Sequence, residues 1–169
     1  MPNSKTALHI NDVEPRVGTD YPAPHDAPCR QRRRRRLSDA FGLSQFGANL
    51  VELLPGTWSS QRHWHERQDE FIYVVEGEVT LVTNEGETVL TPGMFAGFRA
   101  GVANGHHLTN RSNAIARVLE VGERDDVCGT AGTDAVDSVN AHRPQAIAFT
   151  GQPGEGNRAE RFVVLAAVG

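Results

Sequence analysis

The stretch that decides the fold is EFIYVVEGEVTLVTNEGETVLTPG, residues 70–93. Short runs rich in apolar and β-branched residues follow one another here, and each run ends at a turn signal: Glu76-Gly77, Asn84-Glu85-Gly86 and Pro92-Gly93. Glycine and proline at such positions supply the backbone angles that tight turns require. The stretch therefore predicts β-strands that are joined as hairpins.

The same pattern continues on both sides of this stretch. Further strand-like runs are Gly47–Leu54, Ser59–His65, Phe95–Phe98, Gly105–Asn110 and Ala114–Gly122. No long segment has a helical period, although Asp39–Phe46 could be a helical turn or a loop. Short strands separated by Gly and Pro predict an all-β fold, a sandwich or barrel of antiparallel pairs.

Length and composition fit one soluble domain. The chain has 169 residues, of which 38% are hydrophobic and 22% charged, and no apolar run approaches the length of a membrane span. The N-terminus has no apolar segment behind a basic start, so we expect a cytoplasmic protein without a membrane partner. Two cysteines, Cys29 and Cys128, are too few for a disulfide scaffold and are interpreted as free thiols.

The pattern divides the chain into three parts. Residues 1–36 are expected to form an N-terminal arm, extended or disordered over its proline-rich residues 1–29. Residues 37–125 carry the strand pattern. Residues 126–169 form a tail, packed or partly disordered, in which Phe162–Val168 could add one more strand.

The arm ends in a run of arginines, Arg32–Arg36, preceded by Arg30, within a chain of net charge −4. Such a run could bind phosphates of nucleic acid or an anionic lipid surface. The alternative is a solvated, partly mobile segment whose charge is balanced by the acidic body or a second subunit. No aromatic residues are interleaved with the arginines, which favours the second interpretation, without a nucleic-acid partner.

Two histidines and a glutamate stand out as candidate metal ligands. Because strand side chains alternate between faces, His63 and His65 project together, and Glu70 opens the next strand on the same side. Two nitrogens and one oxygen around a common point suit a divalent metal. His106 could add a ligand from a facing strand, whereas His107 would point away. A His-x-His pair alone also occurs by simple alternation, and His9, His25 and His142 are interpreted as ordinary histidines.

These residues occur in two groups that resemble the motifs of the cupin superfamily over about residues 37–125. Gly56, His63, His65, Glu70 and Gly77 resemble the first motif, and Pro92-Gly93, His106 and Asn110 resemble the second. The resemblance implies a double-stranded β-helix, or jelly-roll barrel. It also implies one divalent metal per chain, Fe, Mn, Ni or Zn, bound by His63, His65, Glu70 and His106. His107 is the rival for the fourth place, and the spacing to Asn110 favours His106.

The hypothesis for function is a metal-dependent enzyme on a small polar or carboxylate substrate, either a dioxygenase-like oxidoreductase or a sugar or enol isomerase or lyase. The alternative is a non-catalytic cupin that binds or senses a small ligand. Gln61 could hydrogen-bond the substrate or orient a ligand, and Phe98 could line the pocket mouth or pack in the core. Trp64, Phe71 and Tyr73 lie on the face away from the metal and predict a homodimer.

Overall fold

The strands of this protein pair into antiparallel sheets that curve around one core. The computed structural model describes residues 6–123, 146–149 and 162–165. The largest sheet runs in the order β1 (Arg16–Val17), β2 (Arg33–Arg36), β3 (Phe46–Leu53), β10 (Ala116–Glu123), β5 (Glu70–Glu76) and β8 (Phe95–Phe98). A second sheet has the order β7 (Gly86–Leu90), β6 (Val79–Thr83) and β9 (His107–Thr109). A third has the order β11 (Ala146–Phe149), β12 (Phe162–Leu165) and β4 (His63–Trp64).

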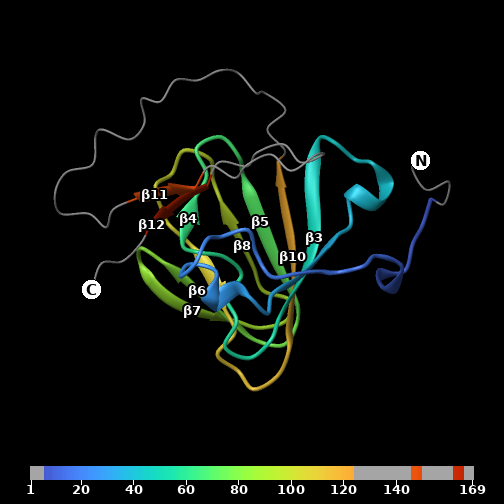
Figure 1. Cartoon of the computed structure of the whole chain (residues 1–169), viewed down its shortest axis with the longest axis horizontal. Helices are drawn as coiled ribbons and strands as arrows, with labels where there is room; N and C mark the ends of the chain where they lie inside the picture. The colour runs from blue at the N-terminus through green and yellow to red at the C-terminus, as the bar shows by residue number, and fades with distance from the viewer. Residues whose placement is uncertain (1–5, 124–145, 150–161, 166–169) are drawn as a thin grey trace.

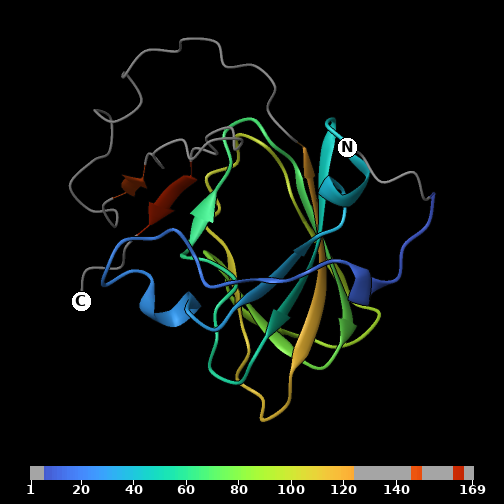
Figure 2. The ribbon, with the colours of Figure 1, turned by 45° about the vertical axis from the view of Figure 1, so that its right-hand side comes forward.

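The arrangement is the expected all-β jelly roll. Figure 1 shows β3, β10, β5 and β8 side by side, with β6, β7 and β4 across from them, and Figure 2 shows the same two walls after rotation. In the described ranges the only helices are single 3-10 turns, η1 (Ile10–Asp12), η2 (Ala27–Cys29) and η3 (Asp39–Phe41). The ambiguous segment 39–46 is thus a helical turn and a short loop that leads into β3 at Phe46. No helix in the described part of the chain is long and apolar enough to cross a membrane.

Alternation along the strands builds the core. On β5, Ile72 and Val74 are buried, whereas Phe71, Tyr73 and Val75 are exposed, as a half-buried strand requires. The buried apolar residues form one cluster: Val51, Leu53, Ile72, Val74, Val79, Leu81, Leu90, Leu108, Ala116 and Val118. Burying each of the larger side chains contributes about 1.5–3 kcal/mol, so this cluster is the main source of stability.

The turn at Gly77 has the geometry that its sequence predicts. Its φ is +74°, and a Cβ there would lie 2.6 Å from the Ile115 carbonyl oxygen. Any side chain at this position would collide with backbone, so the β5–β6 turn requires glycine.

The arginine run differs from its expected form. Arg33–Arg36 is strand β2 and pairs with β3 in the large sheet, so it is not a solvated, partly mobile segment. Its charge is balanced by the acidic body: Arg34 pairs with Glu120 and Arg35 with Glu52. The physical reason is that strand pairing and two ion pairs together offset the cost of ordering these long side chains.

The N-terminal arm has little regular structure, as expected, but it packs against the barrel. The Trp58 amide donates to the Pro28 carbonyl at 2.9 Å, and the buried Arg32 guanidinium donates to the Ser59 and Gly18 carbonyls. Cys29 is a buried free thiol. The division into segments 1–36, 37–125 and 126–169 stays a prediction.

The described part of the tail contributes two strands: β12, where the sequence allowed one, and β11, which the sequence pattern did not indicate. β12 covers Phe162–Leu165 and pairs with β4, with Val164 opposite His63. The rest of the expected run to Val168 lies outside the described residues, as do Cys128 and His142.

Candidate metal centre

The predicted ligands come from three places in the chain that the barrel brings together. His63 begins β4, His65 follows that strand directly, Glu70 begins β5, and His106 precedes β9. The His63 amide donates to the His106 carbonyl at 3.1 Å, and the His106 amide donates to the His63 carbonyl at 2.8 Å. This pair of backbone hydrogen bonds fixes the two histidines opposite each other.

The four side chains point at one centre. Nε2 of His63 lies 3.2 Å from Nε2 of His65, and Oε2 of Glu70 lies 3.0 Å from Nε2 of His65 and 3.1 Å from Nε2 of His106. One ligand atom from each residue lies within 4.8 Å of all the others. Ligands at about 2.1 Å from one metal ion and at right angles to each other lie about 3 Å apart, so the spacing fits a divalent ion.

Backbone carbonyls hold the imidazoles in the required orientation. Nδ1 of His63 lies 2.8 Å from the Gln61 carbonyl oxygen and 3.2 Å from Oγ of Ser60, and Nδ1 of His106 lies 3.2 Å from the Asn104 carbonyl oxygen. A ring whose Nδ1–H donates to a carbonyl presents the Nε2 lone pair to the centre. The sequence pattern did not indicate these acceptors, because a carbonyl oxygen is present at every residue.

Burial sets the charge of the centre. It lowers the pKa of His63 to about 3, opposed by the Glu70 charge and assisted by those of His65 and His106, so the imidazole is neutral at neutral pH. Burial by itself would raise the pKa of Glu70, but the close contacts of its carboxylate with the His106 and His65 rings outweigh burial and hold that pKa below its usual range. Neutral imidazoles and an ionised carboxylate are the forms that bind metal.

A fourth ring beside the cluster belongs to Phe98. It stacks on His106 with 3.6 Å between ring centroids and 5° between planes, and it packs against the core cluster. Phe98 therefore shields one side of a candidate ligand. Gln61 uses its side-chain amide to donate to the His25 carbonyl at 2.6 Å. A contact of either residue with substrate stays a prediction.

His107 lies outside the cluster, on the opposite side of its strand. Its ring stacks on Trp58 at 4.5 Å between centroids, and it is buried. Nδ1 of His107 has no hydrogen-bond partner among the described residues. Alternation of side chains along the chain at β9 thus favours His106 over His107 as the fourth candidate metal ligand.

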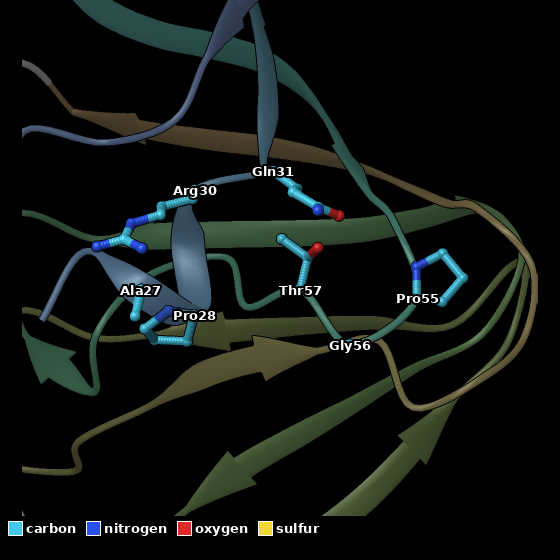
Figure 3. A pocket seen from close by; sticks show the side chains of 7 residues that line it. All are labelled: Ala27, Pro28, Arg30, Gln31, Pro55, Gly56 and Thr57. Atoms are coloured by element: carbon cyan, nitrogen blue, oxygen red, sulfur yellow. The ribbon is translucent and has the colours of Figure 1, made fainter. Parts of the chain in front are cut away.

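A groove lies away from the metal cluster. It has a volume of about 380 Å³ and is lined by Ala27, Pro28, Arg30, Gln31, Pro55, Gly56 and Thr57 (Figure 3). Arg30 in this groove is paired with Asp26 at 2.7 Å. None of the lining residues belongs to the metal cluster, so the groove is a separate surface feature.

The fold and the cluster together define a barrel protein with an internal three-histidine, one-carboxylate site, and comparison with known proteins gives its family. The cupin domain model matches residues 49–122. The chain belongs to the cupin superfamily, on this match and on its likeness to a solved member. A search of curated proteins finds no match.

Solved structures include one with high sequence identity. A protein from Silicibacter pomeroyi, described as a sugar phosphate isomerase from a cupin superfamily, is 48% identical over 70% of this chain and 75% of its own, with a TM-score of 0.68. A protein from Acidithiobacillus ferrooxidans, provisionally described as a sugar phosphate isomerase, is 32% identical over 56% of this chain and 60% of its own, with a TM-score of 0.54. A polyketide cyclase from Streptomyces resistomycificus is 22% identical over 70% of this chain and 79% of its own, with a TM-score of 0.56, and shares the fold.

Proposed function

We propose that this chain is a metal-dependent cupin isomerase that acts on a small hydroxy-carbonyl compound of the sugar type. The observation that carries the proposal is the cluster of His63, His65, Glu70 and His106. The description of the 48% identical relative as a sugar phosphate isomerase supports the choice among cupin activities.

In such an isomerisation an aldose becomes a ketose, since one hydrogen passes from C2 to C1 and the hydroxyl proton on O2 passes to O1. A divalent ion, Fe, Mn, Ni or Zn, would supply Lewis acidity to the two adjacent oxygens. The chain's own residues supply the rest. His63, His65 and His106 would hold the ion with neutral nitrogens, and Glu70 would lower its net charge.

The surroundings of the cluster suit this chemistry. The Glu70 side chain is 18% exposed and that of His65 is 10% exposed, so one side of the centre is accessible to solvent. The His63 and His106 side chains are 7% and 4% exposed. A ligand can therefore approach from the side of Glu70 while the other side stays dry, which strengthens polar interactions at the centre.

Two association properties belong to the same proposal. Phe71 and Tyr73 are each 40% exposed and Phe95 is 66% exposed, all on the outer side of the large sheet, which supports a homodimer through this face. The ion pairs of Arg34 and Arg35 leave less of the arginine run for phosphate backbones, which supports a chain without a nucleic-acid partner. A cytoplasmic location stays a prediction.

The metal test comes first. We expect about one divalent ion per chain by elemental analysis, and His63→Ala and His65→Ala should each lose most of it. His107→Ala is the matched control, because that histidine is adjacent in sequence but stacks on Trp58. Wild-type protein that stays metal-free after incubation with Fe(II), Mn(II), Ni(II) and Zn(II) would show that the cluster is a polar core.

The activity test uses metal-loaded protein with ribose 5-phosphate and glucose 6-phosphate, with ketose formation followed by NMR. We expect conversion that disappears in His63→Ala. Metal-loaded protein that converts neither sugar and consumes no oxygen with small carboxylic or enolic compounds would favour the non-catalytic binding function instead.

A further inference from the structure

The wall of the barrel next to Glu70 carries no side chains on two consecutive strands. On β5, Glu70 lies opposite Gly122 of β10, and Gly122 lies opposite Gly47 of β3. Since paired residues share a face of the sheet, both glycines lie on the face that carries the Glu70 side chain. The Glu70 side chain therefore has no side chain directly across from it on β10 or β3.

At the next level of the same face, polar residues lie beside the core residue Ile72. Glu120 lies opposite Ile72 on one side and Asn49 on the other, and Asn49 lies opposite Arg36. Two residues farther along the strands the face becomes apolar, with Val74, Val118 and Val51 all buried in the core. The barrel interior thus has an apolar end and a polar end, and the metal cluster lies at the polar end.

An ion pair joins Glu120 of this polar level to Arg34, which lies opposite Val51 at the next level of the sheet. Nη2 of Arg34 lies 3.3 Å from Oε2 of Glu120, with side chains 24% and 12% exposed. The Asn49 side-chain amide is partly buried and makes no hydrogen bond with a described residue. A partly buried amide is costly unless it has a polar partner. The hydroxyl groups of a ligand provide such a partner for Asn49.

The distance between the metal cluster and the Arg34–Glu120 pair suits a sugar. Glu120 is the diagonal neighbour of Glu70 across β5 and β10, which places their Cα atoms about 7–8 Å apart. An extended pentose covers this distance, so one molecule could reach both the metal cluster and the Arg34–Glu120 pair.

We propose that Arg34, Glu120 and Asn49 form a recognition subsite for a polyhydroxy substrate with a terminal anionic group. Arg34 binds the phosphate or carboxylate, because a guanidinium has five N–H donors and can serve Glu120 and a ligand anion together. Glu120 accepts hydrogen bonds from the substrate hydroxyl groups that lie between that anion and the metal. Asn49 also forms hydrogen bonds with these hydroxyl groups. The subsite rests on the proposed function, since the other end of the substrate is taken to bind at the metal cluster.

A purely structural role for the Arg34–Glu120 pair has an internal control. Arg35 is the next residue on β2 and pairs with Glu52, but it faces the outside of the barrel. If both ion pairs only hold strands together, Arg34→Gln and Arg35→Gln should have similar effects on ligand binding. If Arg34 recognises substrate, only Arg34→Gln should alter ligand binding.

The experiment is calorimetric titration of the metal-loaded full chain with ribose 5-phosphate, ribonate and ribose. The wild type should bind at least one of the two anionic probes more tightly than ribose, and the preferred probe identifies phosphate or carboxylate as the anion. Arg34→Gln should weaken binding of that probe by about tenfold or more, which is about 1.4 kcal/mol, and leave ribose unaffected. Arg34→Lys should restore part of the affinity, and Arg35→Gln should match the wild type.

Glu120→Gln gives a second readout if Arg34→Gln fails to fold. It keeps the shape of the side chain but removes a negative charge beside the bound anion, so the anionic probe should bind more tightly. Equal binding of all three probes by the wild type, or unchanged affinity in both Arg34→Gln and Glu120→Gln, would overturn the subsite. Metal content is measured in the same samples, so metal-free wild-type protein would count against the proposed function instead.

Discussion

Asn110 lies four residues after His106, and replacing it should cost stability without costing metal. The side chain is fully buried, and its Nδ2 donates to the Leu53 and Ala114 carbonyls, both at 2.7 Å. Its Oδ1 accepts from the amide and the hydroxyl of Ser112, at 3.0 and 2.8 Å. Asn110 thus ties the end of β3 to the loop before β10.

The magnitude follows from these four hydrogen bonds. The two donations into the interior contribute about 1.5 kcal/mol each and the two bonds with Ser112 about 0.5 kcal/mol each, so Asn110→Ala should destabilise the chain by about 4 kcal/mol. In a chain of this size that lowers Tm by about 8–16 °C. Asn110→Asp keeps the shape but turns a carboxylate oxygen toward two carbonyls, and should destabilise more than alanine does.

Urea unfolding of the metal-free protein measures these free energies, and elemental analysis measures bound metal. Asn113→Ala is the matched control, since that asparagine is exposed in the same loop and should change the free energy of unfolding by less than about 0.5 kcal/mol. Metal content should equal that of the wild type in all three variants that fold. A cost below about 1 kcal/mol for Asn110→Ala, or an aspartate variant more stable than the alanine variant, would refute the hydrogen-bond reasoning.

Three further predictions concern stability, pH and association. Gly77→Ala should destabilise more than Gly42→Ala in urea unfolding, because both glycines have positive φ but only Gly77 faces backbone at 2.6 Å; equal costs would contradict this. Burial raises the pKa of the Cys29 thiol from 9.0 to about 11. The stability that the protonated thiol contributes is therefore complete below pH 9 and is lost as the pH rises to 11. Cys29→Ala should remove up to about 2–3 kcal/mol of this alkaline loss of stability. If the pH profile of unfolding is unchanged in Cys29→Ala, the thiol is not the cause of the loss. Light scattering should show a dimer, and Tyr73→Glu should convert it to a monomer. Val89→Glu is the control, because Val89 is exposed on another strand and its replacement should leave the dimer intact. A monomeric wild type at high micromolar concentration would disprove the dimer.

The sequence determined the elements and their faces. Alternation in Glu70–Val75 places Ile72 and Val74 on one face of the strand, which is the buried face, and turn residues such as Gly77 set where the strands end. Alternation likewise placed His63 and His65 on one side and separated His106 from His107. These properties are local, because the direction of a strand side chain depends only on its position along the strand.

Tertiary structure decided which distant residues meet. Glu70 and His106 are 36 positions apart, and only the closure of the barrel brings their side chains to 3.1 Å. The placement of Arg34 beside Glu120, 86 positions away, depends on β2 joining the large sheet, whereas the arginine run by itself suggested a solvated segment. Strand order and register arise from the sum of many pairings and ion pairs across the chain, so no short stretch of sequence contains them.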